Sequence, residues 1–215
     1  MRNIFNTALT ITGPACTLEA RLLYKDNSGS RGVIICPPHP LLAGNLENNV
    51  VQALAKTLCV HFPVLLFNYR AVGNSGSPQP DLPLFEYWDR LDRSGDFSEI
   101  TADTAAVLSW SSKLFASHHL IGYSFGAYIG QQVVTDATRS FTAITPPLAE
   151  HDFTPLARLP IPATIILAEN DDLTPASGQL HQLSHPITTI RKTDHFFRNR
   201  EEELSRLVAT GILQL

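Results

Sequence analysis

The sequence is poor in cysteine, in lysine and in charge. Its three cysteines, Cys16, Cys36 and Cys59, are an odd number without a CxxC spacing, which favours neither a disulfide framework nor a zinc site. Charged residues make up 17% of the 215 residues, below the ~25% of ordinary soluble domains. With four lysines and a net charge of −4, the chain lacks a basic surface for phosphate backbones, which argues against nucleic acid as a partner.

Long hydrophobic runs are also absent. No stretch approaches the roughly 18 apolar residues that a membrane-spanning helix needs. Residues 1–16 carry one Arg and are interrupted by Asn and Thr, so they lack the apolar core of a secretory signal peptide. Together with the cysteine pattern, these absences predict a protein of the reducing cytoplasm.

The chain does contain a regular alternation of short apolar runs and longer amphipathic stretches. The apolar runs, which predict strands, are at 33–36, 64–69, 119–123, 141–145, 164–168 and 188–190. The amphipathic stretches, which predict helices, are at 47–60, 100–115, 125–137, 175–184 and 200–213. This alternation is typical of a mostly parallel sheet with helices on both faces. At this length we expect one α/β domain over 1–215, without a separate cap domain.

One segment, 77–97, interrupts the alternation. It contains three prolines and the aromatic residues Phe85, Tyr87 and Trp88, and it has no clear period. It is either a surface excursion that its aromatic residues fix to the body, or a small lid whose aromatic residues line a pocket, since long loops in compact domains are often functional.

The strongest local motif is the sequence GYSFG at 122–126, which has the form G-x-S-x-G. Between a strand and a helix this spacing predicts a nucleophile elbow, because the glycines allow a tight turn that exposes Ser124. The turn also places Ser124 at a helix N-terminus, where free N–H groups favour negative charge. The alternative is a glycine-rich turn that contains a serine by chance.

A serine hydroxyl needs a base and an orienting carboxylate, and the elbow predicts the chain order Ser, acid, His. Asp171 and Asp172 follow the predicted strand at 164–168, and His195 follows the one at 188–190. His195 is the expected base. The other histidines are expected on the surface, with His118 and His119 solvated at a strand start; no metal-ligand spacing is present, so no metal is expected.

Acyl transfer also needs two donors for an oxyanion. One is expected to be the backbone N–H of Phe125, which follows the nucleophile. The second is expected from the loop CPPHPL at 36–41, in which the prolines have no N–H, so that His39 and Leu41 remain as donors. The alternative for His39 is that its imidazole only packs against or caps the loop.

A set of sequence stretches carries a resemblance that covers most of residues 32–200. They are PPHPL at 37–41 with Gly44, Asn48 and Val50-Val51; FNYRAVGNSG at 67–76; Glu99 and Asp103 through Trp110; the elbow; Thr145-Pro146-Pro147; Asp152-Phe153; the loop at Asp171; and DHFF at 194–197. Together these stretches resemble those of a group of small bacterial α/β-hydrolase-fold proteins. The group departs from this chain at Pro37, where it commonly has a first His, at Ala71, where it has Gly, and in the greater length of 77–97 here.

The resemblance implies the α/β-hydrolase fold and a triad of Ser124, Asp171 and His195. Asp171 is preferred to Asp172 because it matches the group's D-x-x-x-P spacing with Pro175, and His39 becomes the better second oxyanion donor.

We therefore expect a serine hydrolase that cleaves a small-molecule carboxylic ester or thioester and needs no cofactor. Its substrate pocket is expected to include Leu41, Phe85, Tyr87 and Trp88. The alternatives are a peptidase or acyltransferase of the same fold, and a hydrolase-like fold that serves as a non-catalytic binding or accessory protein.

Overall fold

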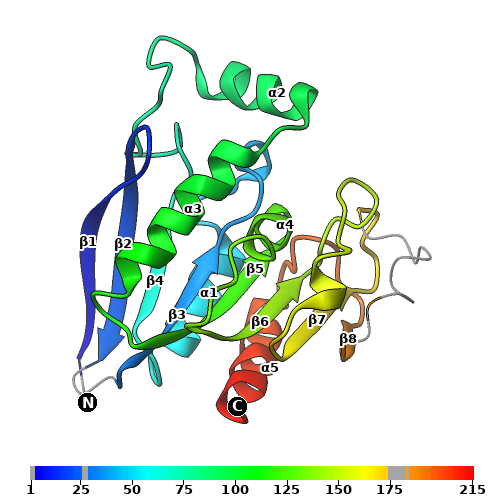
Figure 1. Cartoon of the computed structure of the whole chain (residues 1–215). Coiled ribbons are helices and arrows are strands. Elements are labelled where there is room, and N and C mark those ends of the chain that lie inside the picture. Colours follow the sequence, from blue (N-terminus) through cyan, green and yellow to red (C-terminus); the bar gives the residue numbers. More distant parts are fainter. Residues whose placement is uncertain (1–2, 26–28, 174–182, 184) are drawn as a thin grey trace.

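The fold is built on one sheet, in the computed structural model that describes residues 3–25, 29–173, 183 and 185–215 (Figure 1). Its strands are β1 (Ile4–Thr12), β2 (Thr17–Lys25), β3 (Arg31–Cys36), β4 (Val64–Phe67), β5 (Ser117–Tyr123), β6 (Thr138–Ile144), β7 (Ala163–Ala168) and β8 (Ile187–Ile190). Within the described residues the strand order is β1-β2-β4-β3-β5-β6-β7-β8.

The strands from β4 through β8 in this order are all parallel, as the apolar runs predict. Every residue of β4 and β5 is buried, because helices cover both faces of the sheet there. The parallel strands all end at one edge, so the loops that follow β3, β5, β7 and β8 meet at that edge.

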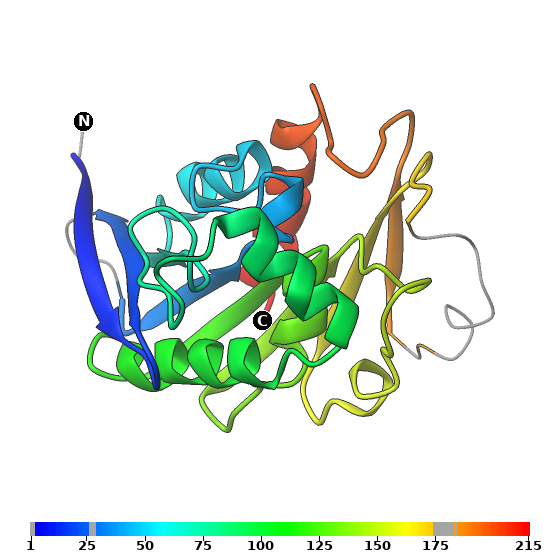
Figure 2. The ribbon, with the colours of Figure 1, turned by 90° about the horizontal axis from the view of Figure 1, so that it is seen from above.

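Helices cover the two faces in two layers, which Figure 2 shows from above. On one face α1 (Asn49–Leu58) and α5 (Glu201–Leu213) bury aliphatic residues against the sheet. On the other face α3 (Ser98–Ser111) and the short α4 (Phe125–Gly130) enclose a second core that includes most of the aromatic residues. This confirms the predicted α/β class with helices on both faces.

The hairpin of β1 and β2 was not predicted. The two strands pair antiparallel with each other, and β2 also pairs antiparallel with β4. β2 lies half-buried at this side of the sheet, with Leu18 and Ala20 buried and Glu19 and Arg21 partly exposed. Its signal is therefore an alternation of buried and exposed positions, which a search for continuous apolar runs misses.

The segment 77–97 contains a helix, α2 (Leu84–Ser94), which ends at Gly95 in the left-handed conformation with φ of 65°. Figure 1 shows α2 standing above α3, outside the two layers that cover the sheet. Its residues Tyr87 and Trp88 are buried, whereas Phe85 is 66% exposed. The sequence did not predict this helix, because the helix buries only a narrow stripe of apolar side chains.

Helix α4 is shorter than the predicted 125–137. It ends at Gly130, before the β-branched run Val133-Val134-Thr135, which disfavours helix. The helix predicted at 175–184 lies almost wholly outside the described residues. Across the described part of the chain, no helix has both the length and the apolar character that crossing a membrane requires.

Candidate active site

The turn between β5 and α4 holds Ser124 in a strained backbone conformation. Its φ is 54° and its ψ is −122°, a region that non-glycine residues rarely adopt. A Cβ atom at Gly122 would lie 2.4 Å from the carbonyl oxygen of Gly126, and one at Gly126 would lie 2.2 Å from that of Cys36. Both glycines are therefore needed for the backbone to pass this closely, which is the geometry of a nucleophile elbow.

Ser124, His195 and Asp171 form a continuous line of hydrogen bonds. His195 Nε2 lies 2.8 Å from Ser124 Oγ, and His195 Nδ1 lies 2.8 Å from Asp171 Oδ2. The three residues follow β5, β8 and β7, and all three are buried. The structure thus brings together the three residues that the sequence predicted as a triad.

Backbone contacts fix the acid loop beside the histidine loop. Asp171 Oδ1 accepts a hydrogen bond from the Leu173 N–H at 2.9 Å, which orients the carboxylate. The Asn170 N–H donates to the Thr193 carbonyl at 3.0 Å. Asp172, the alternative acid, is exposed, because adjacent residues of an extended loop point to opposite sides.

Tyr123 supports the histidine loop from below. Its hydroxyl donates to the His195 carbonyl at 2.9 Å, and its ring stacks on the imidazole with centroids 5.8 Å apart. Burial and the nearby Asp171 carboxylate raise the pKa of Tyr123, so the phenol stays protonated and acts as a donor. This contact fixes the backbone from which His195 projects.

The two predicted oxyanion donors come from adjacent strands. The first hydrogen bond of α4 runs from the Ala127 N–H to the Ser124 carbonyl, so the Phe125 N–H lies before the helical ladder. The Leu41 N–H donates to Nδ1 of the His39 ring at 3.3 Å, which leaves the His39 N–H as the candidate donor of this loop. Within the described residues neither the Phe125 nor the His39 backbone N–H has a hydrogen-bond acceptor.

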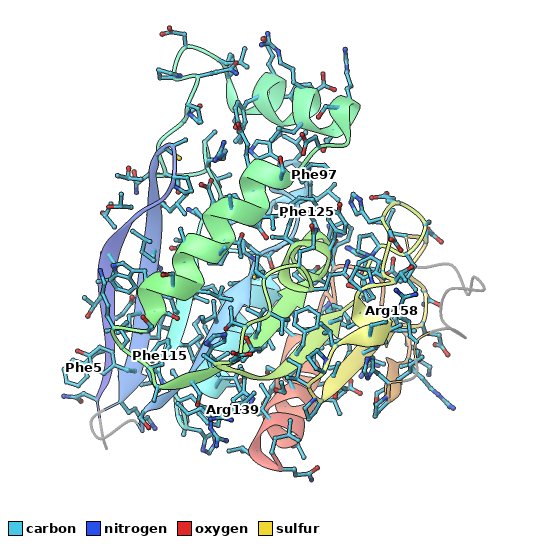
Figure 3. All side chains as sticks on the ribbon, viewed as in Figure 1. Phe5, Phe97, Phe115, Phe125, Arg139 and Arg158 are labelled. Atoms are coloured by element: carbon cyan, nitrogen blue, oxygen red, sulfur yellow. The ribbon has the colours of Figure 1, made fainter. Side chains whose placement is uncertain are left out.

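A pocket of about 640 Å³ opens beside Ser124. One wall is aromatic, with Phe97, Phe125 and Tyr128; the rings of Phe97 and Phe125 lie 4.9 Å apart, and Figure 3 shows them together near the start of α3. The other walls are Leu41 and Leu42 from the loop after β3, the end of α2, and the loop 147–152. The volume is typical of a small-molecule site.

The lining of this pocket differs from the predicted one in the three aromatic residues that were expected from 77–97. Leu41 lines the pocket, but Phe85, Tyr87 and Trp88 are not among its described lining residues. Trp88 is buried beneath the pocket and donates its indole N–H to the Arg70 carbonyl at 3.3 Å. Tyr87 faces Arg70 and a separate cavity, and Phe85, turned by about 200° from Tyr87 around the helix, points to solvent.

Asp92 and Glu150 line the pocket but were not predicted, and His151, which was expected on the surface, lines it as well. The His151 ring stacks on Tyr128 with centroids 4.2 Å apart, and burial together with the nearby His39 lowers its pKa. Asp92 lies at the end of α2, where no periodicity was recognised. Two motifs of the family resemblance, Thr145-Pro146-Pro147 and Asp152-Phe153, lie at the two ends of the loop that carries His151 and were the available signal for it.

Arg70 fixes α2 to the body. Its guanidinium forms a bidentate pair with Asp103 of α3, with distances of 2.6 and 3.0 Å, and also contacts Glu99. Arg70 and Asp103 are both buried. Because Trp88 donates to the Arg70 carbonyl, this pair holds the aromatic base of α2 in place.

The prediction that His118 and His119 are solvated is wrong. Both are buried, and each hydrogen-bonds to a hydroxyl of β6, His118 to Thr138 at 3.0 Å and His119 to Ser140 at 2.7 Å. Burial lowers the pKa of both to about 4. Within the described part of the chain, no group of three or more His, Cys, Asp or Glu residues is placed to hold a metal ion.

Solved structures of similar fold define the class. The chain has the α/β-hydrolase fold: it is similar to an α/β serine hydrolase homologue from Coxiella burnetii, with 28% identity, a TM-score of 0.79 and 98% of both chains covered. It is also similar to a member of the α/β serine hydrolases without a lid from Xanthomonas campestris, with 23% identity, a TM-score of 0.78, and 97% of this chain and 94% of that one covered.

The sequence comparison gives the family. The chain belongs to the same family as the protein named Uncharacterized protein RP471 of Rickettsia prowazekii, to which it is 30% identical over 91% of this chain and 84% of the relative. No protein-family model matches the sequence.

Proposed function

We propose that this protein is a serine hydrolase that cleaves small-molecule carboxylic esters or thioesters through an acyl-enzyme on Ser124. The observation that carries the proposal is the line of two 2.8 Å hydrogen bonds from Ser124 through His195 to Asp171 at the wall of the pocket. The 28% identical serine hydrolase homologue from Coxiella burnetii supports the same class of chemistry.

The hydrogen bonds assign the protons of the resting site. Asp171 accepts from Nδ1 of His195, so this nitrogen carries the proton and Nε2 is free to accept from Ser124. As Ser124 Oγ attacks the acyl carbon, its proton moves to Nε2, and Asp171 stabilises the resulting imidazolium. Because the carboxylate is buried and oriented by Leu173, it meets the imidazolium without rearrangement.

The negative charge that develops on the carbonyl oxygen is stabilised by the N–H groups of Phe125 and His39. Collapse of the tetrahedral intermediate expels the alcohol or thiol, which takes the proton from Nε2 and leaves the acyl group on Ser124. Water then attacks the acyl-enzyme, His195 removes its proton, and the carboxylic acid leaves as Ser124 is restored.

The segment 77–97 is best explained as a fixed wall of this site. Trp88 is buried on the body and α2 contributes Asp92 to the pocket. A fixed wall requires no opening step before substrate binds.

A fluorophosphonate probe tests the proposal, because it phosphonylates only an activated serine. We expect stoichiometric labelling of the wild type, no labelling of Ser124→Ala, and full labelling of the control Ser112→Ala, whose serine is exposed on α3's C-terminal side. A panel of matched esters, acyl thioesters and aminoacyl amides then separates an esterase from a peptidase. Absence of labelling in the wild type would refute the enzyme and favour a binding protein.

A further inference from the structure

The His39 side chain bridges two elements of the pocket. Its Nδ1 accepts the Leu41 N–H at 3.3 Å, and its Nε2 lies 3.0 Å from Asp92 Oδ1 at the end of α2. A backbone N–H can only donate, so Nδ1 has no proton; the proton is on Nε2, which donates to the carboxylate. The two contacts therefore specify a single neutral tautomer.

The ring is packed as tightly as it is hydrogen-bonded. Its edges meet Trp88 and Phe125, each with centroids 5.1 Å apart and planes nearly perpendicular. Its side chain is 14% exposed. Such packing leaves the ring one orientation, in which Nδ1 faces the loop and Nε2 faces α2.

The rest of the loop is equally constrained. The His39 carbonyl accepts from the N–H groups of Leu42 at 2.9 Å and Gly44 at 3.0 Å, and the Pro37 carbonyl accepts from the Tyr69 hydroxyl at 3.2 Å. Pro40 fixes the next backbone angle. The His39 N–H is thus a donor on a loop that these hydrogen bonds hold in place.

We propose that the His39 side chain is a positioning residue, which as the neutral Nε2–H tautomer couples α2 to the loop that carries the oxyanion donor. This inference rests on the proposed function for its effect on rate. The imidazole sets the position of the His39 N–H through the Leu41 cap, and Asp92 sets the position of the imidazole.

The arrangement has a direct consequence at acid pH. A proton on Nδ1 would face the Leu41 N–H, so two donors would meet and the cap would open. The titratable groups that face His39 are Asp92 on α2 and Glu150 and His151 on the loop 147–152. Burial lowers the pKa of His39, more than the two carboxylates raise it, so the cap is intact at neutral pH.

Two substitutions of His39 separate its two contacts. In His39→Asn the amide oxygen takes the place of Nδ1 and accepts the Leu41 N–H, as Asn commonly does two residues ahead and before a Pro. In His39→Gln the amide nitrogen takes the place of Nε2 and reaches Asp92, while the Leu41 cap is lost. We expect kcat to fall by about 10- to 100-fold in His39→Gln, since displacement of a reacting group by about 1 Å costs up to ~10²-fold, and to fall much less in His39→Asn.

KM is expected to change little in either variant, because the oxyanion forms only in the transition state. Asp92→Ala should lower kcat by more than His39→Asn does and by less than His39→Gln does. Asp92→Asn, which keeps the acceptor oxygen, should restore kcat. Asp89→Ala is the control, since Asp89 lies on the same helix, pairs with Arg93 and is not a lining residue.

Amide hydrogen exchange and ¹⁵N NMR of the imidazole test the geometry without any substrate. We expect protection of the Leu41 N–H in the wild type and in His39→Asn, its loss in His39→Gln, and ring shifts of the Nε2–H tautomer. If labelling and turnover fail while these signatures hold, the proposed function is wrong and the coupling stands. Unchanged Leu41 protection or unchanged kcat in His39→Gln would overturn the coupling.

Discussion

The pocket is flanked by two Asp–His pairs that look alike and act differently. In the inner pair Asp171 lies 2.8 Å from Nδ1 of His195, and in the outer pair Asp92 lies 3.0 Å from Nε2 of His39. The second nitrogen of His195 faces a serine hydroxyl, whereas that of His39 faces a backbone N–H. The carboxylates therefore hold the two imidazoles as opposite tautomers.

This difference shows that the partner of the second nitrogen defines the role of such a pair. A hydroxyl can give its proton to the ring, so His195 can act as a base. An amide N–H cannot, so His39 can only hold it in place. Burial differs accordingly, because the Asp171 side chain is fully buried and the Asp92 side chain is 41% exposed.

The largest expected effect comes from removing the charge of the inner pair. Asp171→Asn would favour the wrong tautomer of His195 and lower kcat by about 10⁴-fold, with little change in thermal unfolding. Asp172→Asn is the matched control, because this neighbouring carboxylate is exposed. Steady-state kinetics on one ester measures both, and an unchanged rate in Asp171→Asn would remove Asp171 from the triad.

The second effect concerns the buried ion pair of Arg70 and Asp103, which supports the outer pair. Asp103→Ala would leave the buried Arg70 guanidinium without its bidentate partner, and breaking a buried pair in this way costs about 3–5 kcal/mol. Urea unfolding measures the loss. The exposed Asp136→Ala serves as control. Because Arg70 anchors Trp88 beneath His39, Leu41 protection should fall with it, and unaltered stability would contradict the anchoring role.

Histidines without a carboxylate partner extend the comparison. His118 and His119 have folded-state pKa values of about 4, below the ordinary value of 6.5. The unfolded chain therefore takes up protons first as the pH falls, so stability is complete above pH 6.5 and declines toward pH 4. Each of the two histidines should lower the free energy of unfolding by about 1.4 kcal/mol at pH 5.5.

Urea unfolding at pH 7.5 and 5.5 measures this loss. In His119→Gln the loss of stability between the two pH values should be about half that of the wild type, because one of the two buried histidines is gone. In His61→Gln, at an exposed position, the loss should equal that of the wild type. Equal stability of the wild type at the two pH values would contradict the burial of both rings as neutral groups.

The smallest effect concerns substrate charge. Asp92, Glu150 and Asp152 line the pocket, and none of its described lining residues is Lys or Arg. At about 8 Å in water-like surroundings each carboxylate contributes about 0.5 kcal/mol before screening, and physiological salt reduces this roughly threefold at that distance. The three carboxylates then separate a cationic ester from its anionic analogue by about 1 kcal/mol, so the kcat/KM of the cationic ester should be higher by a few-fold, and by less at high salt. Glu150→Gln should narrow the ratio and Glu203→Gln on α5 should not. An unaffected ratio would refute the electrostatic preference.

The inner pair could be predicted from the sequence because the sheet determines where it lies. Ser124, Asp171 and His195 each follow a parallel strand, and the carboxyl ends of such strands meet at one edge. The strained turn at Ser124 is encoded locally in two glycines. The order along the chain and the strand ends therefore predicted Ser124, His195 and the acid loop, whereas the choice of Asp171 over Asp172 came from the family's spacing to Pro175.

The outer pair could not be predicted, because it depends on how α2 packs. Asp92 meets His39 only because Trp88 and Arg70 fix the helix over the loop, and no spacing in the sequence links 92 to 39. The same reason explains why His118 and His119 were wrongly predicted to be solvated. Hydroxyl groups of the neighbouring strand β6 hydrogen-bond to both imidazoles and so allow them to be buried. Contacts between elements, not local pattern, determine these positions.

The close approach of Gly126 to the carbonyl oxygens of Cys36 and Pro37 has a practical meaning for redesign. Main chain touches main chain there, so the separation of the Phe125 and His39 amides follows from the pairing of Cys36 with Gly122 across β3 and β5. Side chains on the loop 147–152 can therefore be randomised in a library for new substrates while the spacing of the two amides stays constant. Only positions that contact the loop after β3 need to be left intact.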